Sequence, residues 1–385
     1  MSRPPKVFMI AGEPSGDVLG ARLMAALRDL TGGNIEVCGV GGQMMREQGL
    51  ESLFPMEELS VMGITEILPH LPGLLRRIKE TAASVDSTAP DALVTIDSPD
   101  FTRRVARRVT DRTIPRIHFV APTVWAWRPW RAKGFARDFT HLLALLPFEP
   151  PWFERVGLPC TFVGHPVIEA GAGMGDGAGF RAKHGIAVED TVICVLPGSR
   201  RGEIERLAGD FGAAMELLAE RHPGMRLVVP TIEAVAPRVR DLAAGWPGSP
   251  IVVQSTAERY DAMAASNAAL AASGTVALEL ALAGVPTVVA YRVTPLTHFI
   301  VRRLLSIEFG NLINIIEDRE IVPELIQGDC RPDRLAEAME RMLGPEGAAQ
   351  IEAVQPALLQ LGLGAEAPSR RAAQAVLDII ARSGT

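Results

Sequence analysis

The chain has 385 residues, a hydrophobic fraction of 48% and a formal net charge of −6. This length predicts two domains, and the lack of a basic excess argues against a nucleic-acid-binding protein. The four cysteines are scattered and form no Cys-x-x-Cys pair, so they indicate neither a disulfide framework nor a zinc ribbon.

The N-terminal residues lead directly into a predicted strand, without a charged and then apolar signal peptide. No apolar run reaches the length of a membrane span. We therefore expect a cytoplasmic protein that is soluble or attached to a membrane surface.

The first predicted elements are a strand at 7–11, a Gly-rich turn at 12–17 and a helix at 18–30, followed by a strand at 35–40. This order is typical of a doubly wound α/β domain. The turn is not Gly-x-Gly-x-x-Gly, so it does not indicate a dinucleotide site. Two interpretations remain: Ser15 or Asp17 caps the helix, or Glu13 and Ser15 face a ligand above the sheet.

Residues 57–79 combine an apolar pattern with an adjacent basic cluster, and prolines interrupt the pattern. Such a segment fits an interfacial helix with apolar side chains in acyl chains and cations on headgroups. The alternative is a core helix with a solvated basic end. The apolar side chains that would meet the membrane are Val61, Met62, Ile64, Ile67, Leu68, Leu71, Leu74 and Leu75.

A buried strand is predicted at 92–96 and ends at Asp97. Residues just past strand ends line the ligand crevice of an open parallel sheet, so Asp97 is a candidate general base, or else a cap of the following helix. After a strand at 117–120, a loop carries Trp125, Trp127 and Trp130 among arginines. This loop is interpreted as a stacking platform, a membrane-interface belt or a packed corner. Strands at 141–146 and 161–163 complete the first sheet.

Glycines are concentrated at 164–179, which predicts a flexible linker and a domain boundary. The second half then repeats the plan, with strands at 192–196, 227–229 and 251–253 and helices at 202–221 and 260–265. The turn Gly198-Ser199-Arg200 offers a small loop and a guanidinium for a diphosphate. The acidic residues just after it, Glu203 among them, are interpreted as a solvated first helical turn.

The most informative stretch is 268–292, a predicted strand, a turn at Ser273-Gly274, a helix from Thr275 to near 284 and a strand at 286–290. Gly274 permits a close backbone approach, and a helix start after a strand suits a phosphate. Glu279, one turn further on, is placed to accept from sugar hydroxyls. The alternative is an ordinary strand–turn–helix unit, since Ser-Gly-Thr is not a Walker loop. Residues 322–325 are expected to start a turn and helix, and helices at 335–343 and 372–380 to close the chain.

Six motifs carry a resemblance to a known family. They are Ala-Gly-Glu-Pro-Ser-Gly-Asp at 11–17, Glu-Glu-Leu-Ser-Val-Met-Gly-Ile at 57–64, Ile-Asp-Ser-Pro-Asp-Phe at 96–101, Thr-Val-Trp-Ala-Trp-Arg at 123–128, Leu-Pro-Gly-Ser-Arg at 196–200 and Ala-Ser-Gly-Thr at 272–275. In this order they resemble lipid-A-disaccharide synthase over nearly the whole chain. The resemblance implies a GT-B α/β fold, with two Rossmann-like doubly wound domains facing across a cleft.

The expected domains are 1–168 on the acceptor and membrane side, 169–358 for the UDP-sugar, and a C-terminal helix at 359–385. That helix is expected to pack on the N-terminal domain or on a partner chain. The resemblance also allows a homodimer formed through the C-terminal parts.

The resemblance implies an inverting transfer of 2,3-diacylglucosamine from UDP to the 6-hydroxyl of 2,3-diacylglucosamine 1-phosphate, without metal or cofactor. The products are a β-1,6 disaccharide and UDP, made at the inner face of the inner membrane of Gram-negative bacteria. The catalytic residues carried over by position are Asp97, as the base, and Glu13, in the cleft near the transferred sugar. The substrate contacts carried over are Ser15, Gly16, Gly198, Ser199, Arg200, Ser273, Gly274, Thr275, Glu279 and Asn314. The family usually has proline before that asparagine, where this chain has Ile313, so a different turn shape is expected there.

Two other functions fit parts of the sequence. A UDP-N-acetylglucosamine 2-epimerase would share the scaffold but would not need the apolar patch at 61–75. A catalytically idle UDP-sugar-binding or scaffold protein would keep Arg200 and Glu279 but would not need Asp97.

Overall fold

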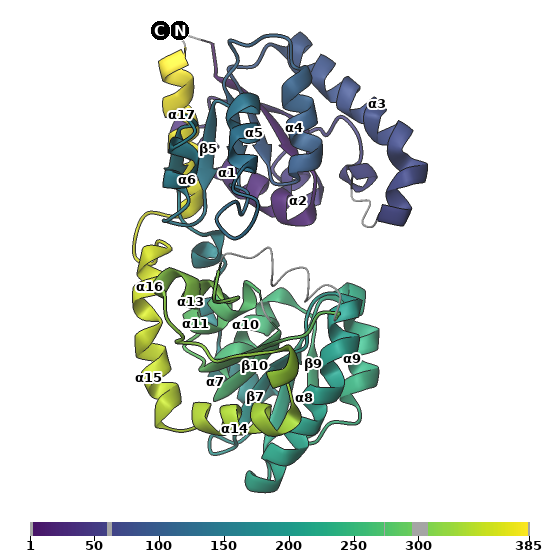
Figure 1. Cartoon of the computed structure of the whole chain (residues 1–385), viewed down its shortest axis with the longest axis vertical. Helices are drawn as coiled ribbons and strands as arrows, with labels where there is room; N and C mark the ends of the chain where they lie inside the picture. Colours follow the sequence, from purple (N-terminus) through teal and green to yellow (C-terminus); the bar gives the residue numbers. More distant parts are fainter. Residues whose placement is uncertain (1–2, 60–63, 273, 295–306, 384–385) are drawn as a thin grey trace. The chain divides into compact units, whose positions relative to one another are not determined.

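The computed structural model describes residues 3–59, 64–272, 274–294 and 307–383. The chain forms two compact units, Met1–Pro166 with Gly364–Thr385, and Val167–Leu363 (Figure 1). These divisions lie close to the expected domain ends at 168 and 358. Each unit contains a six-stranded parallel sheet, so the predicted α/β class is confirmed.

The first unit has the strand order β2-β1-β3-β4-β5-β6. Its strands are short apolar runs because helices cover both faces of a parallel sheet. Their bounds are β1 Lys6–Ala11, β2 Glu36–Val40, β3 Ala92–Ile96, β4 Arg116–Phe119, β5 His141–Ala144 and β6 Cys160–Phe162.

Two hydrophobic cores lie on the two faces of this sheet. The first packs under α3 (Ile64–Thr88), α4 (Pro99–Arg108), α5 (Arg131–Asp138) and α6 (Pro150–Glu154). The second packs under α1 (Pro14–Thr31), α2 (Gln43–Glu47) and α17 (Pro368–Ser383). The last helix, α17, contacts α1, so the chain end returns to the first unit (Figure 1).

The sequence predicted that prolines interrupt the helical pattern at 57–79, but the helix in the structure is continuous. Helix α3 runs without a break from Ile64 to Thr88, through Pro69 and Pro72. Each proline lacks an N–H and so removes one main-chain hydrogen bond. The helix continues because its C-terminal half is anchored in the core through Ile78, Ala82 and Val85.

The second unit has the strand order β12-β11-β10-β7-β8-β9. Its strands are β7 Val192–Leu196, β8 Arg226–Pro230, β9 Ile251–Val253, β10 Ala268–Ala272, β11 Thr287–Tyr291 and β12 Glu324–Ile326. One core lies under α8 (Arg201–Arg221), α9 (Ala236–Ala243) and α14 (Pro332–Met342), and the other under α7 (Gly177–Lys183), α10 (Thr256–Ala264) and α11 (Val276–Leu282). The other α-helices of this unit that the described residues form are α13 (Leu312–Glu317), α15 (Pro345–Ala353) and α16 (Gln355–Gln360). Within the described ranges, no helix has the length and apolar character needed to span a bilayer.

Two predictions for this unit are wrong. The glycines at 171–179 do not form a flexible linker, because the segment packs closely on α10 and α11. A Cβ on Gly175 would lie 2.2 Å from the carbonyl oxygen of Tyr260, and one on Gly173 would lie 3.1 Å from that of Leu282. Residues 322–325 do not start a helix, because Glu324–Ile326 form an edge strand parallel to β11. Pro323, which donates no hydrogen bond, stands just before that strand.

Candidate functional site

A pocket of about 350 Å³ lies in the second unit, at the carboxyl ends of the neighbouring strands β7 and β10. The chain runs outward in opposite directions from these two strands, so this is the topological switch point where doubly wound sheets bind ligands. Six of the predicted substrate residues line it: Gly198, Ser199, Arg200, Gly274, Thr275 and Glu279. Ser273 lies outside the described residues.

Two loops form the floor of the pocket, and each depends on one glycine. Gly198 has φ +120° and Gly274 has φ +149°, conformations that residues with a Cβ rarely adopt. The loop at Gly198 leads into α8, whose N-terminus presents free N–H groups and a positive dipole end. The floor is therefore suited to an anionic group.

Arg200 is held at the start of α8 but remains open to solvent, with its side chain 75% exposed. Its guanidinium lies 3.7 Å from Glu203, and its backbone N–H donates to the other Glu203 oxygen at 3.3 Å. The Tyr291 hydroxyl also donates to Glu203, at 3.5 Å. The prediction that Glu203 is solvated is wrong: it is buried and caps the helix that carries Arg200.

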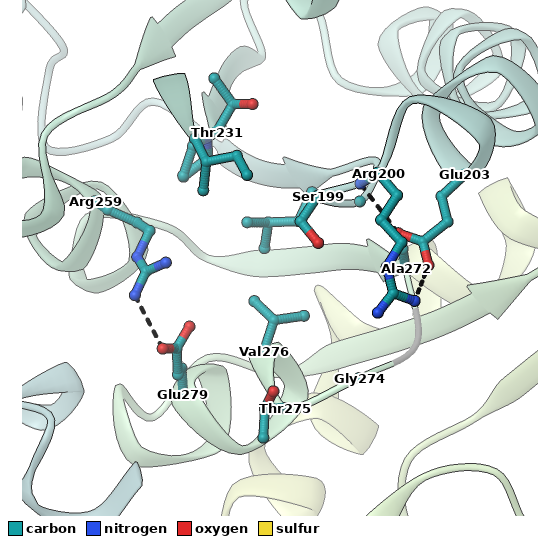
Figure 2. Close-up of a pocket in the computed structure, with 14 residues that line it drawn as sticks. Ser199, Arg200, Glu203, Thr231, Arg259, Ala272, Gly274, Thr275, Val276 and Glu279 are labelled. Carbon is teal, nitrogen blue, oxygen red and sulfur yellow. Dashed lines mark hydrogen bonds and ion pairs between the residues drawn. The ribbon is translucent and has the colours of Figure 1, made fainter. Parts of the chain in front are cut away.

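Glu279 forms an ion pair with Arg259 on α10, at 2.9 Å. The Tyr260 hydroxyl donates to the same carboxylate oxygen at 3.2 Å, and no described residue donates to the other oxygen. Burial raises the pKa of Glu279, and the positive charge of Arg259 acts against that rise. Figure 2 shows this pair at one side of the pocket and Arg200 with Glu203 at the other.

Arg259 and Thr231 are pocket residues that the sequence analysis missed. Within the described part of the chain, the Nε of Arg259 and the hydroxyl of Thr231 are buried without a hydrogen-bond partner. An unsatisfied buried polar group costs about 1–3 kcal/mol, which a ligand could offset. Thr231 directly follows β8, and that position past a strand end was the signal available in the sequence.

Asn314 is not among the residues that line this pocket, contrary to expectation. It is fully buried, and its amide binds the segment before β12: Nδ2 donates to the carbonyl of Val322 and to Glu324, both at 2.8 Å. Its Oδ1 accepts from the N–H groups of Ile321 and Val322 at 2.8 and 2.9 Å. These four bonds use its full capacity, so in this structure Asn314 shapes a loop.

In the first unit, Glu13 and Asp97 follow paired strands, because Ala11 of β1 is in register with Ile96 of β3. Both side chains are partly exposed, so neither is enclosed in the core. Asp97 has φ +51°, Ser98 has φ +45°, and Val120, after β4, has φ +78°. Such conformations cost about 1–3 kcal/mol each and concentrate at functional sites, which supports a functional edge here.

The Asp97 carboxylate accepts the N–H of Ser98 at 2.8 Å, and its backbone N–H donates to Phe119 at 3.0 Å. The carboxylate is thus fixed at the turn into α4 while staying partly open to solvent.

The other residues of the Gly-rich turn at 12–17 have different surroundings. Ser15 is exposed in the first turn of α1, and Gly16 is buried beside β3. Asp17 does not cap its own helix. Its carboxylate accepts from the N–H groups of Gly42, Met44 and Met45 at 2.8–3.1 Å and so caps α2.

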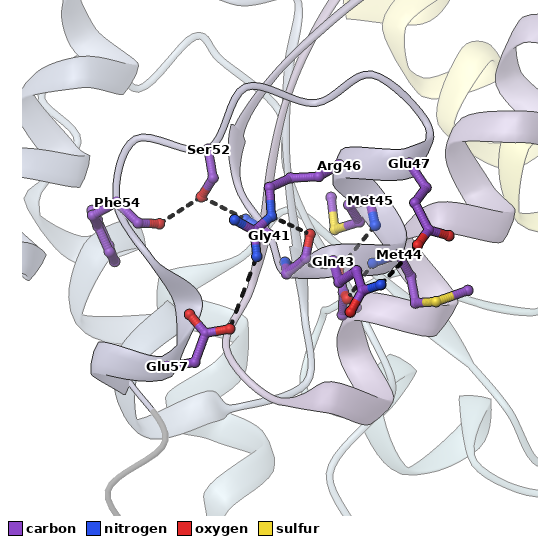
Figure 3. Close-up of polar contacts among 11 residues, drawn as sticks. Gly41, Gln43, Met44, Met45, Arg46, Glu47, Ser52, Phe54 and Glu57 are labelled. Atoms are coloured by element: carbon purple, nitrogen blue, oxygen red, sulfur yellow. Dashed lines mark hydrogen bonds and ion pairs between the residues drawn. The ribbon is translucent and has the colours of Figure 1, made fainter.

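The segment before α3 is tied to the rest of the unit by side-chain contacts. Figure 3 shows Ser52 linking Gly41 to the carbonyl of Phe54, and Arg46 reaching Glu57 at 4.0 Å. Glu58 also pairs with Arg77 of α3, at 2.6 Å. The Glu58–Arg77 pair therefore joins the start of the motif at 57–64 to α3, while Glu57 joins it to α2.

The described side chains include only part of the predicted apolar patch at 61–75. Val61 and Met62 lie outside the described residues, as do the side chains of Ile64, Ile67, Leu68 and Leu71. Leu74 packs partly against the core, and Leu75 is exposed.

The tryptophans at 125–130 differ in their surroundings. Trp125 is buried, stacks edge-on against Phe148 and donates to the buried Glu149 at 3.2 Å. Burial raises the pKa of Glu149 to about 7, although donors from Leu146, Trp125 and Leu145 lower it. Trp130, in contrast, is 65% exposed. The packed-corner interpretation therefore holds for Trp125 and not for Trp130, while Trp127 is half-buried beneath the guanidinium of Arg128.

Comparison with known proteins gives a consistent result. The family model described as lipid-A-disaccharide synthetase matches residues 7–378. The chain is 56% identical to the lipid-A-disaccharide synthase of Rhodospirillum centenum over 99% of this chain and 96% of that protein. It is 51% identical to that of Paramagnetospirillum magneticum, over 97% of each chain.

Solved structures resemble this chain in fold at low identity. The calicheamicin glycosyltransferase CalG4 superposes with a TM-score of 0.61 at 17% identity, covering 99% of both chains. UDP-GlcNAc 2-epimerase from Neisseria meningitidis, bound to UDP-GlcNAc, has a TM-score of 0.60 at 13% identity, covering 98% of this chain and 100% of that one. At this level of identity the likeness establishes the fold and no activity.

Proposed function

Because the chain belongs to the lipid-A-disaccharide synthase family and is a glycosyltransferase of GT-B fold, we propose that it condenses two diacylated glucosamines. The donor is UDP-2,3-diacylglucosamine and the acceptor is 2,3-diacylglucosamine 1-phosphate. The products are the β-1,6 disaccharide 1-phosphate and UDP. The observation that carries this proposal is the pocket in which five residues of the family motifs come together with Glu279.

In this proposal the pocket holds the UDP part of the donor. The loops at Gly198 and Gly274 approach the diphosphate, with Ser199 and Thr275 beside it, and Arg200 forms charge-assisted hydrogen bonds to its oxygens. Glu279 accepts from the ribose hydroxyls through Oε2, the oxygen to which no described residue donates. The neutralised diphosphate is then a good leaving group.

The acceptor alcohol meets Asp97, the proposed general base. Asp97 takes the proton of the 6-hydroxyl while that oxygen forms a bond to C1 of the donor sugar. The bond between C1 and the phosphate oxygen breaks, and its electron pair leaves with UDP. A single displacement inverts C1, so no second carboxylate is needed as a nucleophile. Glu13, Ser15 and Gly16 are assigned to the same edge, near the transferred sugar.

The substrates carry acyl chains, so the enzyme must reach a bilayer, at the inner face of the inner membrane. We assign this contact to the N-terminal half of α3, from the apolar residues at 61–75. Replacing Ile67, Leu68 and Leu71 by serine should move the protein from membranes to the soluble fraction. Unchanged sedimentation with vesicles would remove this assignment.

The reaction is tested by measuring UDP release from the diacylated donor with and without the monosaccharide 1-phosphate. We expect release that depends on the acceptor and a disaccharide product by mass spectrometry. Conversion of UDP-N-acetylglucosamine alone to its 2-epimer would instead support the epimerase. No turnover by the folded protein with either substrate would support a binding protein.

A further inference from the structure

A strongly basic face covers one side of the first unit, on α4 and α5. Residues 99–108 and 128–138 together carry eight cationic and two acidic side chains, a local net charge of +6 in a chain whose total is −6. The catalytic proposal uses none of these side chains. Such segregation of charge generates a local positive potential in an otherwise acidic protein.

One of the two acidic residues is already neutralised inside this face. Asp138 is buried and pairs with Arg103 and Arg107, each at 2.7 Å. In contrast, Arg131, Lys133 and Arg137 have no ion-pair partner among the residues described. Their charges are therefore available to an external anion.

The cations surround an open groove of about 710 Å³. Trp130 lines it together with Arg103, Arg131, Lys133 and Arg137, and its side chain is 65% exposed. An exposed tryptophan beside lysine and arginine is the combination found at the boundary between a bilayer and water.

The position of these cations on the first unit also favours contact with a bilayer surface. Helices α3, α4 and α5 are successive neighbours over one face of the sheet (Figure 1). Both α3 and α5 lead into the next parallel strand, so their N-terminal ends lie toward the carboxyl edge of the sheet. The start of α5, at Trp130 and Arg131, is thus on the same side of the unit as the apolar half of α3.

We propose that the face formed by α4, α5 and Trp130, here called the basic face, binds the anionic headgroups of a phospholipid bilayer. Attachment then has an apolar part, through α3, and an electrostatic part, through the basic face, since two weak signals together give stable anchoring. This inference rests on the proposed membrane attachment. Its continuity with α3 favours a lipid surface over a nucleic acid.

The test uses the full chain and vesicles of phosphatidylcholine with or without phosphatidylglycerol. The variant with Arg131→Gln, Lys133→Gln and Arg137→Gln should bind phosphatidylglycerol vesicles roughly ten- to a hundredfold more weakly at low salt. Binding to pure phosphatidylcholine should not change, and high salt should remove most of the difference.

A matched control removes three charges elsewhere. Arg221, Arg334 and Arg341 line a groove on the second unit in which Glu337 and Glu340 lie among them. Changing these arginines to glutamine should leave vesicle binding as in the unaltered chain. Thermal unfolding of both variants checks that each is folded.

UDP release from substrates dispersed in detergent should be unaffected by either triple change, which separates this inference from the proposed reaction. Equal partition of the basic-face variant and the unaltered chain onto phosphatidylglycerol vesicles would overturn the inference. A selective loss of binding to single-stranded RNA, with vesicle binding intact, would also overturn it.

Discussion

Arg259 is expected to keep Glu279 ionised, and replacing it should make UDP binding depend on pH. Burial raises the pKa of Glu279, and the guanidinium at 2.9 Å opposes that rise. In Arg259→Met the opposing charge is gone, so the carboxyl group keeps its proton to higher pH. A protonated Glu279 is a weaker acceptor for the ribose hydroxyls.

The size of the effect follows from the contact that is lost. Only 15% of the Glu279 side chain and 24% of the Arg259 side chain are exposed, so solvent screens their interaction only partly. A hydrogen bond to a charged group contributes about 1.5–3 kcal/mol, which corresponds to roughly a 10- to 150-fold change in the dissociation constant. The variant should lose affinity within this range while Glu279 is protonated and regain part of it as the pH rises and the carboxyl group ionises.

Calorimetric titration of UDP with both proteins at each pH measures this, because the ratio of their dissociation constants cancels the titration of UDP itself. We expect the ratio of the Arg259→Met constant to the constant of the unaltered chain to fall as the pH rises. The double variant with Glu279→Gln should bind weakly at every pH, because no titrating carboxyl remains. Parallel profiles for the unaltered chain and Arg259→Met would refute the reasoning.

Three further predictions follow from individual side chains. Asp97→Asn should lower turnover by roughly 10²- to 10⁴-fold while keeping the UDP dissociation constant, and a retained rate in the folded variant would remove the base. Arg200→Ala should weaken UDP binding, whereas Arg201→Ala, which alters a residue outside the pocket lining, should not; equal effects of the two would contradict the assignment. Glu149 has a pKa raised to about 7 by burial, so its contribution to stability is complete below about pH 4.5 and is lost as the pH rises through 7. Urea unfolding should show about 3 kcal/mol less stability at pH 8 than at pH 5 from this group, a difference that Glu149→Gln should abolish.

The fold was predictable because its strands are short apolar runs between turn residues. The expected ranges 92–96 and 192–196 coincide with β3 and β7, which are buried along their whole length. The residues after them, Asp97 and the turn at 198–200, could therefore be assigned to a sheet edge from sequence alone. Strand ends are where a parallel α/β sheet exposes backbone and side chains to a ligand.

Arg259 and Thr231 could not be found in this way. Thr231 reaches the pocket because β8 lies beside β7, and Arg259 because α10 packs next to that edge. Strand order is a property of the folded sheet, and a single sequence does not state which strands become neighbours. Buried polar atoms in the pocket that have no partner among the described residues then identify these two side chains, and such atoms are visible only once the packing is known.

Glu203 and Asn314 were misjudged for a related reason, because residue type alone does not distinguish a polar group that meets a ligand from one that holds the backbone. Glu203 was predicted to be solvated, but it is buried next to Arg200 and caps the helix. Asn314 was predicted to contact the ligand, but its amide group makes its hydrogen bonds to the loop before β12. In both cases the deciding quantity is how many hydrogen bonds the group already makes within the chain. By the same criterion Glu279 still has an oxygen without a donor among the described residues, and Arg200 is mostly exposed, so these two side chains can still bind a ligand.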